Sequence, residues 1–168
     1  MFDLALDEWI AEPGAEPVTI TYATSSDTAS SSDYSARTAT VTIPAGASSR
    51  FVNVPVRPDA VDELDETFFL NLSAPVNASM PDPQAQATII DSDPTPQVSI
   101  GDVTSAEGDS GTRTFTFSVT MSGKSSRTVT ADFITVDDTA TAPRDYTAKT
   151  GTVSFAPGTT SPREGRPV

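Results

Sequence analysis

The sequence repeats itself at the distance of a whole domain. Residues 33–46 read DYSARTATVTIPAG and residues 145–158 read DYTAKTGTVSFAPG, an offset of 112 residues. Upstream, Val18-Thr19 matches Val129-Thr130 at an offset of 111, so one residue is inserted before the second Asp-Tyr pair. Solenoid repeats are roughly 20–50 residues long, so a period of this length indicates a complete domain. We therefore expect two related modules in tandem, and the function should lie in what one module does.

Side-chain alternation with a period of two predicts an all-β chain. Apolar residues alternate with Thr and Ser over residues 18–22 and 115–121, which is typical of half-buried strands, and no stretch has a helical pattern. Pro-Ala-Gly at 44–46 and Ala-Pro-Gly at 156–158 are turn signals. Many short strands between turns predict antiparallel β-sandwiches. We expect strands at about residues 2–7, 17–23, 38–43, 50–56, 67–73, 85–90, 97–100, 113–121, 127–135 and 150–155.

The boundary between the two modules is predicted at the segment DSDPTP, residues 91–96. Its two prolines fix the backbone and end the preceding strand, which makes a short, stiff linker. The expected domains are residues 1–93 and residues 97–168.

Composition excludes several classes of function. The net charge of −13 disfavours nucleic acid and anionic membranes as partners, because both require a basic surface. The chain has no Cys and no His, which excludes disulfides, thiolate metal sites and Ser-His triads. No apolar run reaches the ~20 residues of a membrane span, and the acidic start does not read as a signal peptide.

The most acidic segment is DAVDELDETF, residues 59–68, which has five acids in its first eight positions and lies between two predicted strands. Clustered carboxylates supply the oxygen ligands that Ca²⁺ prefers. The segment is not an EF-hand loop, because Leu64 stands where that loop requires glycine. Loops at one end of a sandwich could add Asp33, Asp91 and Asp93 to a composite site. A solvated acidic loop without an ion is the alternative.

Several of these motifs together resemble the Calx-β domain family. They are the acidic segment, the Asp-Tyr pair with the TVTIPAG run that follows it, the closing ATIIDSD, and Glu107-Gly108 after Val103. The resemblance covers residues 2–96 and 97–161. It implies a seven-stranded immunoglobulin-like sandwich, here as tandem immunoglobulin-like antiparallel β-sandwiches. The family occurs in sodium–calcium exchangers, integrin β4 and large bacterial surface and adhesion proteins.

The resemblance also implies a set of calcium ligands. In calcium-binding members these come from a first-strand Glu, the Asp of Asp-Tyr, the acidic loop and the acids that close the last strand. The first copy is expected to lack the first strand, and the second copy to lack the last strands together with the acidic loop. The corresponding residues are Asp33, Asp59, Glu63, Glu66, Asp91 and Asp93 in the first copy and Glu107 and Asp145 in the second.

The function implied by the resemblance is a calcium-binding, non-enzymatic module of an extracellular or cell-surface protein in adhesion or communication, with a membrane-associated parent protein. Its expected partners are calcium ions, neighbouring repeats and surface proteins or glycans, and no nucleic acid. A purely structural spacer without calcium is the alternative, and a carbohydrate-binding accessory domain ranks third. Paired carboxylates can also indicate a glycosidase, but thin sandwiches offer few deep clefts.

Overall fold

The structure is a computed structural model that describes the backbone of residues 2–5 and all of residues 16–162. Every regular element in these ranges is a β-strand, and almost all of the pairing is antiparallel. The predicted all-β, antiparallel fold class is therefore confirmed. None of the described segments forms a helix of the length and apolarity that crossing a membrane requires.

The chain divides into two compact units, each described here by itself. The first comprises residues 1–59 and 64–91, and the second comprises residues 60–63 and 92–168. The short segment 60–63 lies in the middle of the acidic loop, so part of that loop packs with the second unit.

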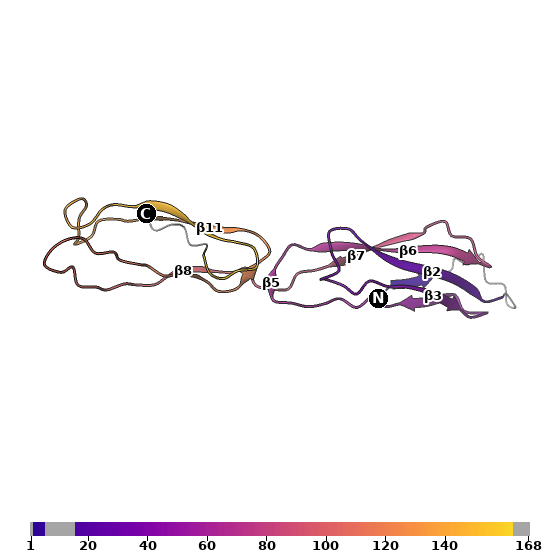
Figure 1. Cartoon of the computed structure of the whole chain (residues 1–168). Helices are drawn as coiled ribbons and strands as arrows, with labels where there is room; N and C mark the ends of the chain where they lie inside the picture. The colour runs from indigo at the N-terminus through magenta and orange to yellow at the C-terminus, as the bar shows by residue number, and fades with distance from the viewer. Residues whose placement is uncertain (1, 6–15, 163–168) are drawn as a thin grey trace. The chain divides into compact units, whose positions relative to one another are not determined.

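A four-stranded antiparallel sheet is the main layer of the first unit (Figure 1). Its order is β3-β2-β6-β7, and a separate antiparallel pair joins β1 to β4. The alternation of β2 places Val18 and Ile20 in the core while the residues between them are less buried. The strands are β1 (Phe2–Ala5), β2 (Val18–Ser26), β3 (Thr38–Ile43), β4 (Ser49–Val52), β6 (Glu66–Val76) and β7 (Gln84–Ile89), and the core residues are Val18, Ile20, Ile43, Val52 and Leu70.

A second apolar cluster of the first unit forms around the tyrosine of the Asp-Tyr pair. Tyr34 is buried with Ala29 and Phe68, and its ring stacks on Phe68 with 4.3 Å between the centroids. The Tyr34 hydroxyl lies 3.1 Å from the hydroxyl of Ser26 at the end of β2. The cluster joins the loop after β2 to the beginning of β6, so it fixes where the Asp33 main chain lies.

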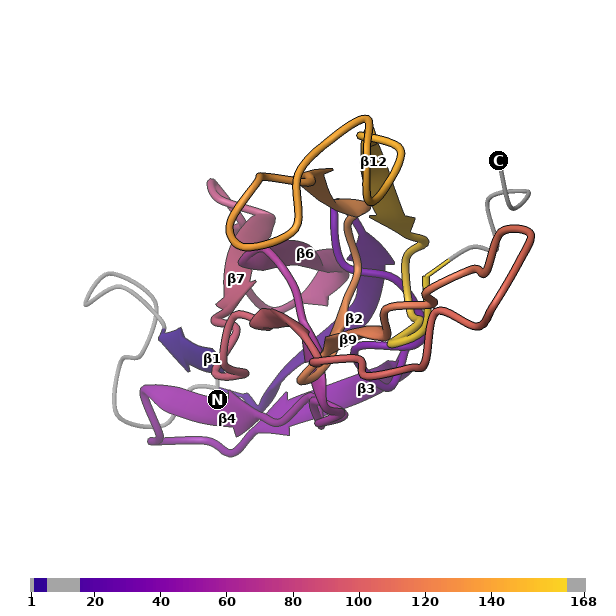
Figure 2. The ribbon, with the colours of Figure 1, turned by 90° about the vertical axis from the view of Figure 1, so that its left-hand side faces the viewer.

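Among its described residues, the second unit has its strands in two-stranded pairs (Figure 2 labels β9 and β12). β8 pairs with β9 and β11 pairs with β12, both antiparallel, while β5 pairs with β10 in parallel. Its buried apolar side chains among the described residues are Met121 and Phe155. The strands are β5 (Val61–Asp62), β8 (Val98–Ile100), β9 (Val119–Met121), β10 (Lys124–Ser125), β11 (Val129–Ile134) and β12 (Thr150–Phe155).

The internal repeat is preserved in the backbone. The Thr24 N–H donates to the Arg37 carbonyl at 2.9 Å, and the Thr135 N–H donates to the Lys149 carbonyl at the same distance. The Arg37 N–H donates back to Thr24 Oγ1, and the Lys149 N–H donates back to Thr135 Oγ1, both at 2.9 Å. The register is also the same, with Ala23 opposite Thr38 in β2–β3 and Ile134 opposite Thr150 in β11–β12. β11 and β12 are therefore the counterparts of β2 and β3.

The observed strands differ from the predicted ones in three places. The strand expected at 50–56 is limited to β4, Ser49–Val52. The strand expected at 113–121 is limited to Val119–Met121, and the short strands β5 and β10 were not expected. A strand requires a hydrogen-bonded neighbour, and among the described residues the β8–β9 ladder ends at Ile100 and Val119, beyond which one hydrogen bond joins the Gly101 N–H to the Ser118 carbonyl. The expected extension of the first strand to residues 6 and 7 lies outside the described residues.

Candidate metal site

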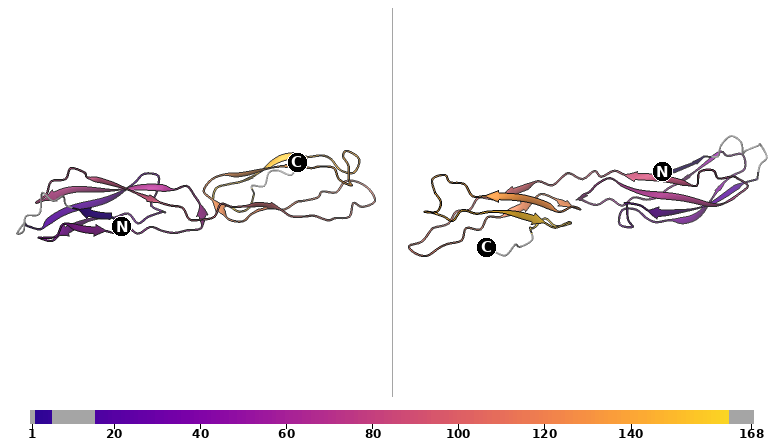
Figure 3. Two further views of the ribbon diagram at one scale, coloured as in Figure 1. Left: turned by 180° about the vertical axis from the view of Figure 1, so that it is seen from behind. Right: turned by 90° about the horizontal axis from the view of Figure 1, so that it is seen from above.

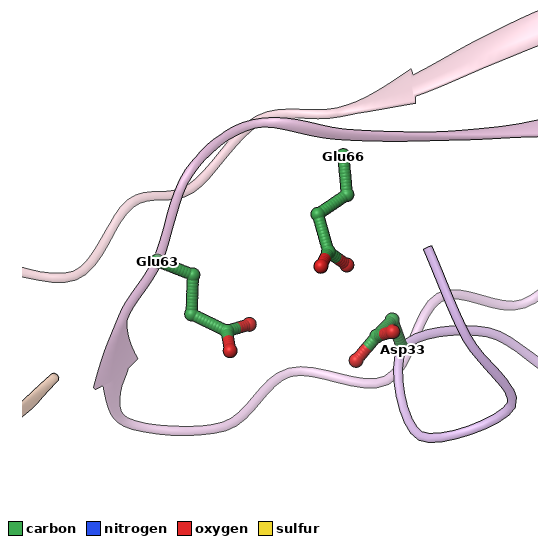
Figure 4. Close-up of side chains that lie close together, drawn as sticks. All are labelled: Asp33, Glu63 and Glu66. Atoms are coloured by element: carbon green, nitrogen blue, oxygen red, sulfur yellow. The ribbon is translucent and has the colours of Figure 1, made fainter. Parts of the chain in front are cut away.

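The structure brings three carboxylates close together. One oxygen from each of Asp33, Glu63 and Glu66 lies within 4.8 Å of the others, and all three residues are partly buried. Figure 4 shows their carboxyl groups directed toward a common space, with Asp33 on one loop and the two glutamates on the acidic segment. Asp33 lies thirty positions before Glu63 in the sequence, so the fold brings them together.

Local hydrogen bonds hold Asp33 in place. The Ser30 N–H donates to Asp33 Oδ2 at 2.6 Å, and the Asp33 N–H donates to the Ser30 carbonyl at 3.2 Å, which closes a tight turn. The Arg57 N–H donates to the Asp33 carbonyl at 2.7 Å, and Tyr34 forms an isolated antiparallel β-bridge with Val56. The turn is therefore attached to the chain that leads into the acidic segment, while Glu66 is the first residue of β6.

The electrostatics of the cluster favour an ionised Asp33. Partial burial raises the pKa of Asp33, but hydrogen bonds from the Ser30 main chain and with the side chains of Ser30, Ser32 and Glu66 lower it. The net effect is a pKa below the ordinary value of an aspartate. A carboxylate that stays charged beside two glutamates creates a negative site.

The donor set fits a hard cation. Three carboxylates offer up to six oxygens, and Ca²⁺ takes about six to eight oxygen ligands from mono- or bidentate carboxylates, carbonyls and water. Crowded carboxylates repel one another unless a proton or a cation neutralises them. With no His or Cys in the chain, imidazole and thiolate ligands are excluded, and oxygen ligation is the chemistry available.

The other predicted ligands lie outside this group, as judged within the described ranges. The Asp91 N–H donates to Asp65 Oδ1 at 3.0 Å, just after β7. In the second unit, Arg113 Nε donates to the Glu107 carbonyl at 3.2 Å, and Asp145 Oδ2 accepts from the Thr141 N–H at 2.9 Å. The metal role of these residues stays a prediction, as does that of Asp59 and Asp93.

Asp62 is the residue of the acidic segment that sequence reasoning passed over. It is only 5% exposed, and its carboxylate accepts hydrogen bonds from Ser125 Oγ at 2.8 Å, Arg127 at 3.1 Å and Thr95 Oγ1 at 3.2 Å. Its carbonyl accepts from the Ser126 N–H at 2.9 Å. The Arg127 guanidinium forms an ion pair with Asp62, while the Arg127 side chain itself stays about half exposed. The acidic composition of the segment gave no signal that one carboxylate turns inward.

Removing the charge of Asp62 is expected to destabilise the second unit in a pH-dependent way. The Ser125 hydroxyl and then the Arg127 guanidinium hold the pKa of Asp62 below its ordinary value, against the effect of burial. An unfolded aspartate has a pKa of about 3.9, so this stabilisation is present above that pH and is lost as the pH falls through the lower folded pKa. Asp62→Asn should therefore lower the melting temperature by several degrees at pH 7, and the gap to wild type should narrow below pH 4.

The control for this measurement is Asp109→Asn, because Asp109 is an exposed acid of the second unit. Its melting curve should follow that of the wild-type chain at every pH. A gap between Asp62→Asn and wild type that stays constant from pH 7 to pH 2.5 would mean that the lost charge is not the cause.

The comparisons with known proteins give one family. The family model of the Calx-beta domain matches residues 11–93 and again residues 97–163. No curated protein sequence matches the chain.

The chain is also similar to solved structures that are named as Calx domains. The apo-form Calx CBD1 domain is 28% identical over 47% of this chain and 73% of its own, with a TM-score of 0.43. The calcium binding domain CBD12 of CALX1.1 is 21% identical and CBD12 from CALX1.2 is 23% identical, each over 95% of this chain with a TM-score of 0.48. The chain spans 65% of the length of each CBD12 structure.

Proposed function

Since the chain belongs to the Calx-beta domain family, which matches it twice, we propose that it is a calcium-binding, non-enzymatic module. The observation that carries the proposal is the meeting of Asp33, Glu63 and Glu66, whose oxygens lie within 4.8 Å of one another. These three residues would hold the ion. The calcium would supply positive charge that offsets the mutual repulsion of the carboxylates.

The protein's own part in this function is to position the ligands. The Ser30 turn and the Tyr34–Phe68 stack hold Asp33 and the beginning of β6 near each other before any ion arrives. Ligands that are already in place lose little conformational entropy on binding. Binding would in turn make the acidic segment stiffer, because it would tie Glu63 to the turn of Asp33 and to the beginning of β6.

We place the module in an extracellular or cell-surface protein of adhesion or communication, with a membrane-associated parent protein. Weak calcium sites suit extracellular modules, whose dissociation constants are about 10⁻⁴–10⁻³ M. In that setting the partners would be calcium, neighbouring repeats, and surface proteins or glycans. A net charge of −13 supports this setting, since it keeps an exposed array soluble and disfavours nucleic acid.

One observation favours a purely structural spacer as the second candidate. Asp33 Oδ2 already accepts the Ser30 N–H at 2.6 Å, and Asp145 Oδ2 accepts the Thr141 N–H at 2.9 Å in the same way. A corresponding turn, which is one residue longer in the second unit, therefore forms in both units, although among the described residues the three-carboxylate cluster is found only around Asp33. Asp33 and Asp145, the aspartates of the two Asp-Tyr pairs, therefore have a structural role that needs no ion.

Calcium is expected to raise the melting temperature of the first unit by about 5–10 °C. With a dissociation constant of about 10⁻⁴ M, 1 mM Ca²⁺ stabilises the folded state by about 1.4 kcal/mol. For a domain of about 100 residues this energy corresponds to the stated rise. The measurement is a thermal melt of the full chain in Ca²⁺ and in EDTA, together with a calorimetric titration.

The test variant is Glu63→Gln with Glu66→Gln, which removes two charges but keeps Asp33 and its turn. The calcium-dependent rise should disappear in this variant and persist in the control Glu16→Gln, where an exposed acid before β2 is changed. If 5 mM Ca²⁺ leaves the wild-type melting curve where EDTA leaves it, the spacer function is correct.

A further inference from the structure

Two of the three clustered carboxylates lie on chain segments that a small hydrogen-bond network joins. β2 and β6 run side by side and antiparallel in the first unit (Figure 3), and their ladder ends at Ser26. Glu66 is the first residue of β6, and the chain beyond Ser26 leads into the turn in which the Ser30 N–H donates to Asp33 Oδ2 at 2.6 Å. The separation of the two carboxylates therefore depends on what holds residues 27–29 against the beginning of β6.

Thr28 is the centre of this connection. The Thr67 N–H donates to Thr28 Oγ1 at 2.7 Å, and the Ala29 N–H donates to the Thr67 carbonyl at 2.9 Å. Thr67 directly follows Glu66 in the sequence, and Ala29 directly precedes the turn. Past the end of the ladder, a side-chain hydroxyl thus satisfies a main-chain N–H that a strand neighbour would otherwise bind. The two ligand-bearing segments are joined on both sides of the Thr67 peptide group.

The hydroxyl hydrogens of this connection have a fixed order. Thr67 Oγ1 donates to Asp27 Oδ2 at 2.7 Å and lies 3.3 Å from Thr28 Oγ1. A threonine hydroxyl has one hydrogen to donate, and an ionised carboxylate only accepts. Because Thr67 gives its hydrogen to Asp27, the Thr28 hydroxyl donates to Thr67 Oγ1. Thr28 Oγ1 therefore accepts from the main chain of Thr67 and donates to its side chain, and a valine could do neither.

We propose that Thr28 is a positioning residue of the calcium site, an inference that rests on the proposed function. The Thr28 hydroxyl is already used by Thr67, so Thr28 acts through Thr67 and not as a ligand. It holds Glu66 and the turn of Asp33 at the separation that a shared cation requires. Residues that orient metal ligands without touching the metal typically change metal affinity by about 10- to 100-fold. Ligands that are held in place also lose less conformational entropy on binding.

The experiment is a calorimetric Ca²⁺ titration of the full chain and of Thr28→Val, which keeps the side-chain shape, the net charge and every carboxylate. The dissociation constant of Thr28→Val should be about tenfold higher than that of the wild type. Hydrogen exchange in EDTA should become faster at the Ala29 and Thr67 amides, because their hydrogen bonds to this network weaken. Thr28→Ser restores the hydroxyl, so it should bind calcium nearly as tightly as the wild type.

The matched control is Thr139→Val. Asp138-Thr139-Ala140 repeats Asp27-Thr28-Ala29 at the offset of 111 residues, and Thr139 is exposed. Thr139→Val makes the same chemical change outside the carboxylate cluster, so the calcium affinity should stay that of the wild type.

Three outcomes would overturn the positioning role and leave the proposed calcium site intact. The first is an unchanged calcium affinity in Thr28→Val. The second is a Thr28→Val chain that melts at a lower temperature in EDTA but binds calcium as the wild type does, because the network would then serve stability alone. The third is an equal loss of affinity in Thr28→Ser, since the hydroxyl would then not be the cause. A wild-type chain that takes up no calcium would instead overturn the proposed function, and the positioning role with it.

Discussion

Replacing Phe68 with alanine is expected to lower the melting temperature of the first unit by more than about 10 °C. Phe68 is 2% exposed, and its ring stacks on Tyr34 at 4.3 Å. Removal of a buried Phe side chain costs about 3–5 kcal/mol, because transfer energy is lost and a cavity remains. Each kcal/mol corresponds to about 4–8 °C for a domain of this size. A thermal melt followed by circular dichroism measures the effect.

The matched control is Phe51→Ala, because Phe51 is 55% exposed on β4. Exposed substitutions usually change stability by no more than about 0.5 kcal/mol, so the two alanine variants should differ widely. Equal melting temperatures for Phe68→Ala and Phe51→Ala would show that the Tyr34 cluster is not a core of the folded unit. Since this cluster holds Asp33 and β6 together, Phe68→Ala should also weaken any calcium effect on stability.

Residues 97–168 expressed alone are expected to be unfolded or aggregated. The buried apolar side chains of the second unit in the described residues are Met121 and Phe155, whereas the first unit buries several times that number. So small a core offsets little of the entropy cost of ordering the chain. The fragment also loses β5, and with it the Asp62 carboxylate that pairs with Arg127. Its large exposed hydrophobics are Ile100, Phe115, Phe117, Phe133, Ile134 and Val136.

The comparison fragment is residues 1–93, which retains the four-stranded sheet and both apolar clusters. We expect it to melt cooperatively while residues 97–168 show no transition by circular dichroism. A sharp transition in the shorter fragment would contradict this expectation and would mean that Met121 and Phe155 are supported by packing beyond the strands described here.

Only part of the candidate site could be predicted from the sequence. The resemblance to Calx-β domains implied a set of eight possible ligands, and the fold brings Asp33, Glu63 and Glu66 of that set together. Composition could not separate these from Asp62, which lies one position before Glu63 and turns inward to Ser125 and Arg127. The difference depends on which neighbours a side chain meets, and those neighbours are more than sixty residues away in sequence.

By itself the sequence determined most β-strands of the sheet, the turns between them and the existence of two related copies. These features depend on local chemistry, since alternating Val, Ile and Thr fit a pleated strand and Pro-Ala-Gly ends it. Only the tertiary structure decided that residues 60–63 pack with the second unit, that β5 and β10 pair in parallel, and that three of the acids share one space. Those outcomes depend on long-range pairing, in which the gain from burial and hydrogen bonding must exceed the entropy cost of closing the loop, and no local pattern encodes that balance.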